Sequence, residues 1–196
     1  MNQQLNELLL QALETERGGA EVYQTALRCA INPDLKEDWE EYLDQTNLHV
    51  EILDELFEKF GLDHEQDSPG RNVIKHIGDA LVLAMEMALE SGKPEMAEIV
   101  ACECVVLAET KDHANWELLA MCAEKAKGEE ALVLKEACEA VVKQEDEHFY
   151  HSKGWCRELW IDSLEMRAVL PPPEERKEVK TAIGAARAQQ LRNKMR

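Results

Sequence analysis

Glycine, proline and basic residues are scarce in this sequence. Among 196 residues there are 9 glycines and 6 prolines, and most of them fall between segments with helical periodicity. Because both residue types interrupt helices, this distribution favours an all-α fold. Lysine and arginine number 22 against 40 acidic residues, which gives a formal charge of −18. A chain this acidic repels phosphate groups, so nucleic acid and anionic membranes are disfavoured as partners.

Long apolar runs and C-x-x-C motifs are also missing. No stretch approaches the roughly 18 apolar residues of a membrane span, and the first residues do not follow the pattern of a secretory signal, so we expect a cytoplasmic protein. All six cysteines fall inside expected helices, which favours reduced, partly buried thiols over a disulfide framework or a zinc knuckle. They are Cys29, Cys102, Cys104, Cys122, Cys138 and Cys156.

Hydrophobic residues recur at intervals of three and four along four long segments and one shorter segment. The spacing predicts long helices over about 2–31, 33–60, 94–127 and 129–166, and a connecting helix over about 73–90. Short turns pair the long helices within each half of the chain, and the connecting helix lies between the halves. This order describes a four-helix bundle with one long connection.

The chain divides into a bundle domain over residues 1–170 and a C-terminal extension over residues 171–196. Residues 174–196 contain seven basic and three acidic residues, which is the reverse of the balance in the rest of the chain. We expect a short helix or a mobile arm there, able to dock on an acidic neighbouring subunit. The exposed aromatic residue Trp160 makes a homodimer plausible.

Each long helix carries a polar group on its apolar stripe, near its middle. These groups are Glu16 on the first long helix, His49 on the second, Glu109 and Asp112 on the third, and Glu145 and His148 on the fourth. Carboxylates buried without partners are costly, so groups facing one interior must share protons, pair with cations or coordinate a metal. With few inward lysines or arginines, a metal is the simplest explanation, and carboxylates mixed with imidazoles suit iron or manganese better than zinc. For any single residue the alternative is a hydrogen-bonded core side chain or a wrongly assigned helix face.

The two halves of the chain resemble copies of each other. Glu16 is followed seven residues later by Tyr23, and Glu109 is followed seven residues later by Trp116. Both aromatic residues are expected in the core. Gly18 and Gly19 are expected to admit a close neighbouring helix or to leave room for a metal and an oxidant. The remaining histidines are expected outside the metal site, with His113 beside it or on the surface and with His64, His76 and His151 facing solvent.

These motifs are similar to those of the ferritin-like superfamily, in particular rubrerythrin-type bundles and the small bacterial ferritin-like stress proteins. The likeness covers about residues 3–160, and "LDQTNLHVEILDELFEKFGLD" resembles the second helix of the stress proteins. In that superfamily the first and third helices each give a Glu ligand and the second and fourth each give Glu-x-x-His, which together hold two metal ions about 3.5–4 Å apart. The resemblance implies metal ligation by Glu16, His49, Glu109, Glu145 and His148, with Asp112 as an extra carboxylate of the third long helix.

One position departs from the family pattern. The fourth long helix has a full Glu-x-x-His match in "EDEH", but the second has "TNLH", so Thr46 stands where a bridging carboxylate is expected. A hydroxyl is a weak, neutral ligand and does not balance the charge of a second divalent ion. Either Asp112 compensates, or the site holds one metal, or it holds metal poorly. The rubredoxin module of rubrerythrins is also missing, because the chain has no C-x-x-C pair.

The resemblance implies a ferritin-like metalloprotein with a di-iron or manganese centre that reacts with dioxygen or peroxide. Its activity would be that of a ferroxidase or of a peroxide-scavenging stress protein, and its partners would be metal ions and the oxidant. Two alternatives stay open. One is a non-catalytic bundle with a degenerate metal site that acts as a stress or interaction protein, and the other is a hydroxylase of an organic substrate on the same scaffold.

Overall fold

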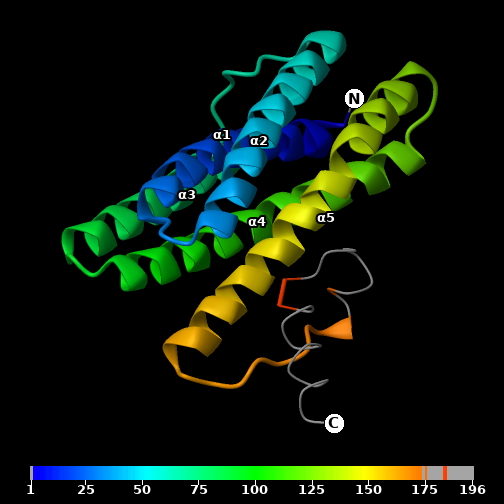
Figure 1. Cartoon of the computed structure of the whole chain (residues 1–196). Coiled ribbons are helices and arrows are strands. Elements are labelled where there is room, and N and C mark those ends of the chain that lie inside the picture. The colour runs from blue at the N-terminus through cyan, green and yellow to red at the C-terminus, as the bar shows by residue number, and fades with distance from the viewer. Residues whose placement is uncertain (1, 174, 176–182, 185–196) are drawn as a thin grey trace.

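Five helices account for the ordered architecture of the computed structural model, which describes residues 2–173, 175, 183 and 184 (Figure 1). Within these residues there is no β-strand. The helices are α1 (Gln3–Cys29), α2 (Pro33–Phe60), α3 (Pro69–Glu90), α4 (Pro94–Lys125) and α5 (Glu129–Ser163). The expected all-α fold is confirmed, and the predicted C-terminal extension over 171–196 lies mostly outside the described residues.

Capping residues fix the helix boundaries. The side chain of Asn32 accepts hydrogen bonds from the backbone N–H groups of Asp34 and Leu35, and α2 ends at Gly61, which has a φ of 62°. The connecting helix is longer than predicted. It begins at Pro69 because Ser68 caps it by accepting the N–H of Arg71, a start signal that was assigned to the preceding loop.

Four of the helices form a ring in which α1 and α5 each pack between α2 and α4 (Figure 1). Neighbours in the ring run antiparallel. On α1 and α4, for example, Tyr23 pairs with Glu109 while the earlier Glu16 pairs with the later Trp116. The arrangement directs the inner faces of all four helices toward one interior.

Helix α3 lies outside the ring, against α1 and α4. It runs parallel to α1, and the two helices approach closely at glycines. A Cβ atom built on Gly18 would lie 3.8 Å from the Cα atom of Gly78. The glycine pair therefore permits the close neighbouring helix that was one of the two expectations for this position.

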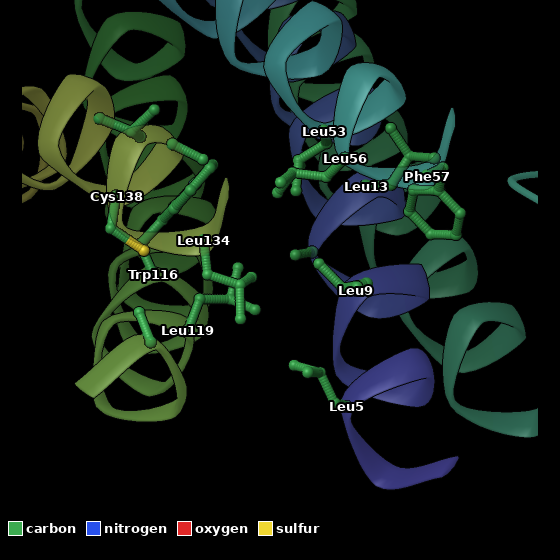
Figure 2. Packing of buried hydrophobic residues seen from close by; sticks show 14 of the residues in the cluster. Leu5, Leu9, Leu13, Leu53, Leu56, Phe57, Trp116, Leu119, Leu134 and Cys138 are labelled. Carbon is green, nitrogen blue, oxygen red and sulfur yellow. The ribbon is translucent and has the colours of Figure 1, made fainter. Parts of the chain in front are cut away.

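Two apolar clusters fill the interior, one toward each end of the bundle. The first includes Leu9 and Leu13 of α1, which Figure 2 shows facing the side of the cluster formed by Trp116 and Leu134. The second gathers around Trp39, Tyr42, Met85 and Cys102. Burial of these large apolar surfaces is the main stabilising contribution to the fold. Between the clusters, each helix of the ring contributes polar residues to a central layer.

Several large apolar residues lie near the surface. Ile31 is 53% exposed because it follows the end of α1, and Phe60, Val106 and Trp155 are only half-buried. Trp160, the residue that suggested a homodimer, is also half-buried, and its indole N–H donates to Glu103. In the described part of the chain, no helix combines the length and apolarity needed to cross a membrane.

Candidate metal centre

The central layer contains all six residues predicted as metal ligands. Each is at most 4% exposed, and together they come from all four helices of the ring. They are Glu16, His49, Glu109, Asp112, Glu145 and His148. The polar groups on the apolar stripes of the four long helices therefore meet in the interior, as the sequence predicted. Their role as metal ligands stays a prediction.

Within the part of the chain that the structure describes, two groups of three residues have the geometry to hold a metal ion, and they share Glu145. One group is Glu16, His49 and Glu145, the other is Glu109, Glu145 and His148, and within each the candidate ligand atoms all lie within 4.8 Å of one another. The Nδ1 atom of His49 lies 3.2 Å from Glu145 Oε1, and the Nδ1 atom of His148 lies 3.4 Å from the same oxygen. One carboxylate thus stands between two imidazoles.

Two glutamines orient the imidazole rings. The Nε2 atom of His49 lies 2.8 Å from Oε1 of Gln144, and the Nε2 atom of His148 lies 2.7 Å from Oε1 of Gln45. A glutamine oxygen only accepts, so each histidine donates its Nε2–H outward. In the neutral ring this leaves the Nδ1 lone pair directed at the carboxylates, as a metal ligand requires.

The glutamines were missed at the sequence level although a signal exists. Gln45 and Gln144 each precede a histidine of the centre by four residues, so "QTNLH" and "QEDEH" share one spacing. Each glutamine is hydrogen-bonded to the histidine of the neighbouring helix rather than to the histidine of its own helix. The sequence does not show this pairing between α2 and α5.

Two aromatic residues also form hydrogen bonds to carboxylates of the neighbouring helix. The hydroxyl of Tyr23 on α1 donates to Oε1 of Glu109 on α4 at 2.7 Å, and the indole N–H of Trp116 on α4 donates to Oε1 of Glu16 on α1 at 2.6 Å. The seven-residue spacing noted in the sequence therefore serves two reciprocal hydrogen bonds across the bundle. Each bond fixes one oxygen of a carboxylate, and the other oxygen is buried without a hydrogen-bond partner among the described residues.

Seven buried polar atoms of the central layer have no hydrogen-bond partner among the described residues. They are Glu16 Oε2, His49 Nδ1, Glu109 Oε2, Asp112 Oδ1, both carboxylate oxygens of Glu145 and His148 Nδ1. Buried polar groups are nearly always paired, so such a concentration requires a ligand or bound protons. All seven are carboxylate oxygens or imidazole nitrogens, which are atom types that can bind a divalent iron or manganese ion.

Protons take the place of a cation when no metal is bound. Burial opposes protonation of His49, but the carboxylates of Glu145 and Glu16 outweigh it and raise the pKa of the imidazole to about 10. Burial also acts on Glu145, yet His148 and His49 lower its pKa to about 2. Burial raises the pKa values of Glu109 and Asp112 well above their ordinary range. The carboxylates therefore share protons unless a metal replaces them.

Thr46 and Asp112 mark the departure from the family pattern. Thr46 is buried, and a Cβ atom built on Gly19 would lie 3.6 Å from its Cγ2 atom, so this corner of the layer is filled by small neutral groups. Burial raises the pKa of Asp112, and the neighbouring carboxylate of Glu16 raises it further. Four carboxylates and two imidazoles therefore meet in the layer although Thr46 carries no charge.

The other histidines lie outside both groups. His113 pairs with Asp146 at 2.8 Å and stacks on Phe149. His64 and His76 are exposed, as expected. The expectation for His151 was wrong, because this residue is buried and its Nδ1 lies 2.5 Å from the hydroxyl of Tyr42. The hydroxyl group across the helix interface explains why a polar ring is tolerated there.

No protein-family model, curated protein or solved structure matches the chain. The centre is therefore interpreted from its own residues.

Proposed function

We propose that the protein is a ferritin-like metalloprotein that binds two iron or manganese ions in the centre of its helical bundle and reacts with dioxygen or peroxide. The observation that carries this proposal is the pair of buried three-residue groups that share Glu145. Their unpaired ligand atoms have the chemistry of a metal site and point into one interior.

The order of the helices supports the ferritin-like part of the proposal. Among the four helices of the ring, α4 comes next in the chain after α2, and the two run in the same direction, which requires a long return between them. Helix α3 supplies that return along the outside of α1 and α4. A ring of four antiparallel neighbours with one crossover is the arrangement of ferritin-like bundles.

The charges of the layer support two divalent ions. The first ion would take Glu16, His49 and Glu145, and the second would take Glu109, Glu145 and His148. With Asp112 included, the layer offers four carboxylates, whose negative charge, when all are ionised, balances the positive charge of two divalent ions. Asp112 would thus supply the negative charge that Thr46 lacks.

The surrounding residues support a reactive centre rather than an exposed ion site. Tyr23 and Trp116 each hold one oxygen of a carboxylate, and Gln45 and Gln144 fix the two imidazoles. The apolar clusters on both sides exclude bulk water. When bound, a pair of iron or manganese ions supplies the electrons that reduce dioxygen or peroxide.

The rival proposal is a non-catalytic bundle that acts as a stress or interaction protein with its polar layer satisfied by protons. Thr46 is the observation in its favour, because it removes a bridging carboxylate from the family pattern. The raised pKa values of Glu109 and Asp112 show how protons would neutralise such a layer.

Metal loading separates the two proposals. The metal-free chain is incubated with Fe²⁺ or Mn²⁺ without oxygen, desalted and analysed for bound metal, and its melting temperature is compared with that of the metal-free protein. We expect two ions per chain, a higher melting temperature because the ions bind the folded state, and oxidation of bound Fe²⁺ when dioxygen or peroxide is added. The Glu145→Ala variant should lose these properties and the exposed-site control Glu139→Ala should keep them. A chain that binds no metal and melts at an unchanged temperature supports the rival.

A further inference from the structure

Two cysteines lie side by side at the edge of the second apolar cluster. Cys102 on α4 is fully buried, Cys156 on α5 is half-buried, and both belong to the same apolar cluster, where Cys156 packs against the buried residues. The Sγ atom of Cys102 also lies 3.8 Å from the carbonyl oxygen of Ser152, one turn before Cys156 on α5. The contact thus joins two antiparallel helices of the ring.

We propose that Cys102 and Cys156 form a redox-active thiol pair that peroxide converts to a disulfide linking α4 to α5. Because Cys102 Sγ packs against the turn of α5 that leads from Ser152 to Cys156, side-chain rotation is the movement that a disulfide between the two cysteines requires. The proposal adds a second oxidant-sensitive site to the chain, and it does not depend on the proposed metal centre.

The environments of the two thiols assign their roles. The neighbouring Cys102 side chain lowers the pKa of Cys156 and outweighs the opposing effects of burial and Glu103. The same contact, with burial, raises the pKa of Cys102. Since the thiolate is the nucleophile, the half-exposed Cys156 is the attacking residue and the buried Cys102 is the resolving residue.

The reaction balances with one peroxide molecule. The Cys156 thiolate attacks one peroxide oxygen, the O–O bond breaks, and a sulfenic acid and hydroxide form. Cys102 then attacks the sulfenic sulfur, the S–O bond breaks, and the disulfide forms as the thiol proton leaves with the hydroxyl group as water. Two thiols lose two electrons in total, and hydrogen peroxide is reduced to two water molecules.

The remaining cysteines provide internal controls. Burial raises the pKa of Cys104 to about 11 and that of Cys138 to about 11. Cys122 and Cys138 lie on the same two helices as the proposed pair, and Cys122 adds to the effect of burial on the pKa of Cys138. Cys122 and Cys138 therefore serve as a control pair, because they also lie on α4 and α5 but are not the proposed redox pair.

The test treats the reduced full-length chain with equimolar hydrogen peroxide in the presence of a metal chelator, and peptide mass spectrometry then locates the products. We expect the chain to lose two hydrogens and to yield a cross-linked peptide that contains Cys156. Cys102 and Cys104 have no trypsin site between them, so the Cys104→Ser variant is included to show that Cys102 is the partner.

The variants divide the two steps. Cys156→Ser should remove the cross-link, whereas Cys102→Ser should stop the reaction at a sulfenic acid on Cys156 that dimedone traps. Cys138→Ser should leave the cross-link intact, and so should Glu145→Ala, because that variant disables the metal centre and not the thiols. The proposal is overturned if peroxide modifies Cys156 no faster than Cys122, or if Cys156 couples to a different cysteine. Either result leaves the metal proposal untouched.

Discussion

The first half of the chain (α1 and α2) and the second half (α4 and α5) place similar side chains around the centre, yet they differ in charge. Four positions correspond, and the matched pairs are Glu16 with Glu109, Tyr23 with Trp116, Gln45 with Gln144, and His49 with His148. Two further positions correspond in the sequence but differ in charge. Gly19 of the first half corresponds to Asp112 of the second, and Thr46 corresponds to Glu145. The first half gives the centre one carboxylate and the second gives three.

The two halves therefore contribute unequally to the four carboxylates of the centre. Gly19 and Thr46 occupy one corner together, and neither carries a charge. At the matching positions of the second half, Asp112 and Glu145 are both buried acids. We infer that Asp112 compensates for Thr46, so each prediction below changes one half and uses the other as its control.

Removal of Glu145 is expected to have the largest effect, because this residue belongs to both three-residue groups. Glu145→Ala should reduce bound Fe²⁺ or Mn²⁺ from two ions per chain to none, as measured by elemental analysis after desalting. Glu16→Ala changes a residue of only one group, and it should leave one ion bound. Equal losses in the two variants would contradict the shared role of Glu145.

Moving one carboxylate from position 112 to position 46 tests whether Asp112 compensates for Thr46. Asp112→Asn should weaken the binding of one of the two ions by at least about tenfold, because a negative charge is lost beside Glu16. Thr46→Glu should restore affinity in the Asp112→Asn background, and in the metal-free parent chain it should cost about 1–3 kcal/mol by burying a fifth carboxylate. Calorimetric titration of the four chains in this cycle measures the coupling. Additive effects would mean that the two positions are independent.

The glutamines are expected to act more weakly, through the histidines that they orient. Gln144→Ala should reduce the affinity of the ion near His49, and Gln45→Ala that of the ion near His148, each by about 10–100-fold. Metal competition with a chromophoric chelator resolves the two sites. If the variants leave both affinities unchanged, the ring orientation does not depend on these bonds.

The effect of pH should have opposite signs for stability and metal binding. The folded pKa of His49 is about 10, above its ordinary value of 6.5, so its stabilising contribution is complete below pH 6.5 and is lost as the pH rises toward 10. The contribution of Glu145, whose pKa is lowered to about 2, is present above its ordinary value of 4.5 and is lost as the pH falls toward 2. The metal-free chain should therefore melt at progressively lower temperature from pH 6.5 to 9.

Metal affinity should rise over the same pH range, because the ions displace protons from the buried ligands. Melting curves with and without Mn²⁺ at each pH measure both trends. A metal-free chain whose melting temperature rises through this range would show that His49 is not held protonated by the carboxylates.

Loss of the reciprocal hydrogen bonds is expected to have the smallest effect on binding. Tyr23→Phe frees one oxygen of Glu109, and Trp116→Phe frees one oxygen of Glu16. Each change should destabilise the metal-free chain by about 1–3 kcal/mol in urea unfolding, because a buried acceptor loses its donor. The tryptophan variant also loses apolar contacts, so a larger cost for Trp116→Phe than for Tyr23→Phe is expected.

Much of the fold followed from the sequence because helix formation and capping are local. The three-to-four spacing gave the helices to within a few residues, and it placed Glu16 and His148 in the interior. The start of α3 was the exception, since Ser68 and Pro69 were assigned to a loop. Helix boundaries are the least certain part of such predictions, as local caps compete with turn signals.

The features that were missed depend on how the helices are aligned with one another. The bond from Gln144 to His49 joins α5 to α2, and the contact of Cys102 with Cys156 joins α4 to α5. A periodic pattern within one helix carries no information on such pairs. His151 was assigned to the surface for the same reason, because its partner Tyr42 lies on another helix. A recurring spacing such as Gln-x-x-x-His in both halves is the signal that sequence reasoning could have used.

Anomalous diffraction from crystals of the Mn²⁺-loaded protein tests the central claim most directly, since it locates each ion without reference to activity. We expect two peaks in the central layer, one beside His49 and the other beside His148, with Glu145 in contact with both. Crystals soaked under the same conditions that show no ion within reach of Glu145 would contradict the account.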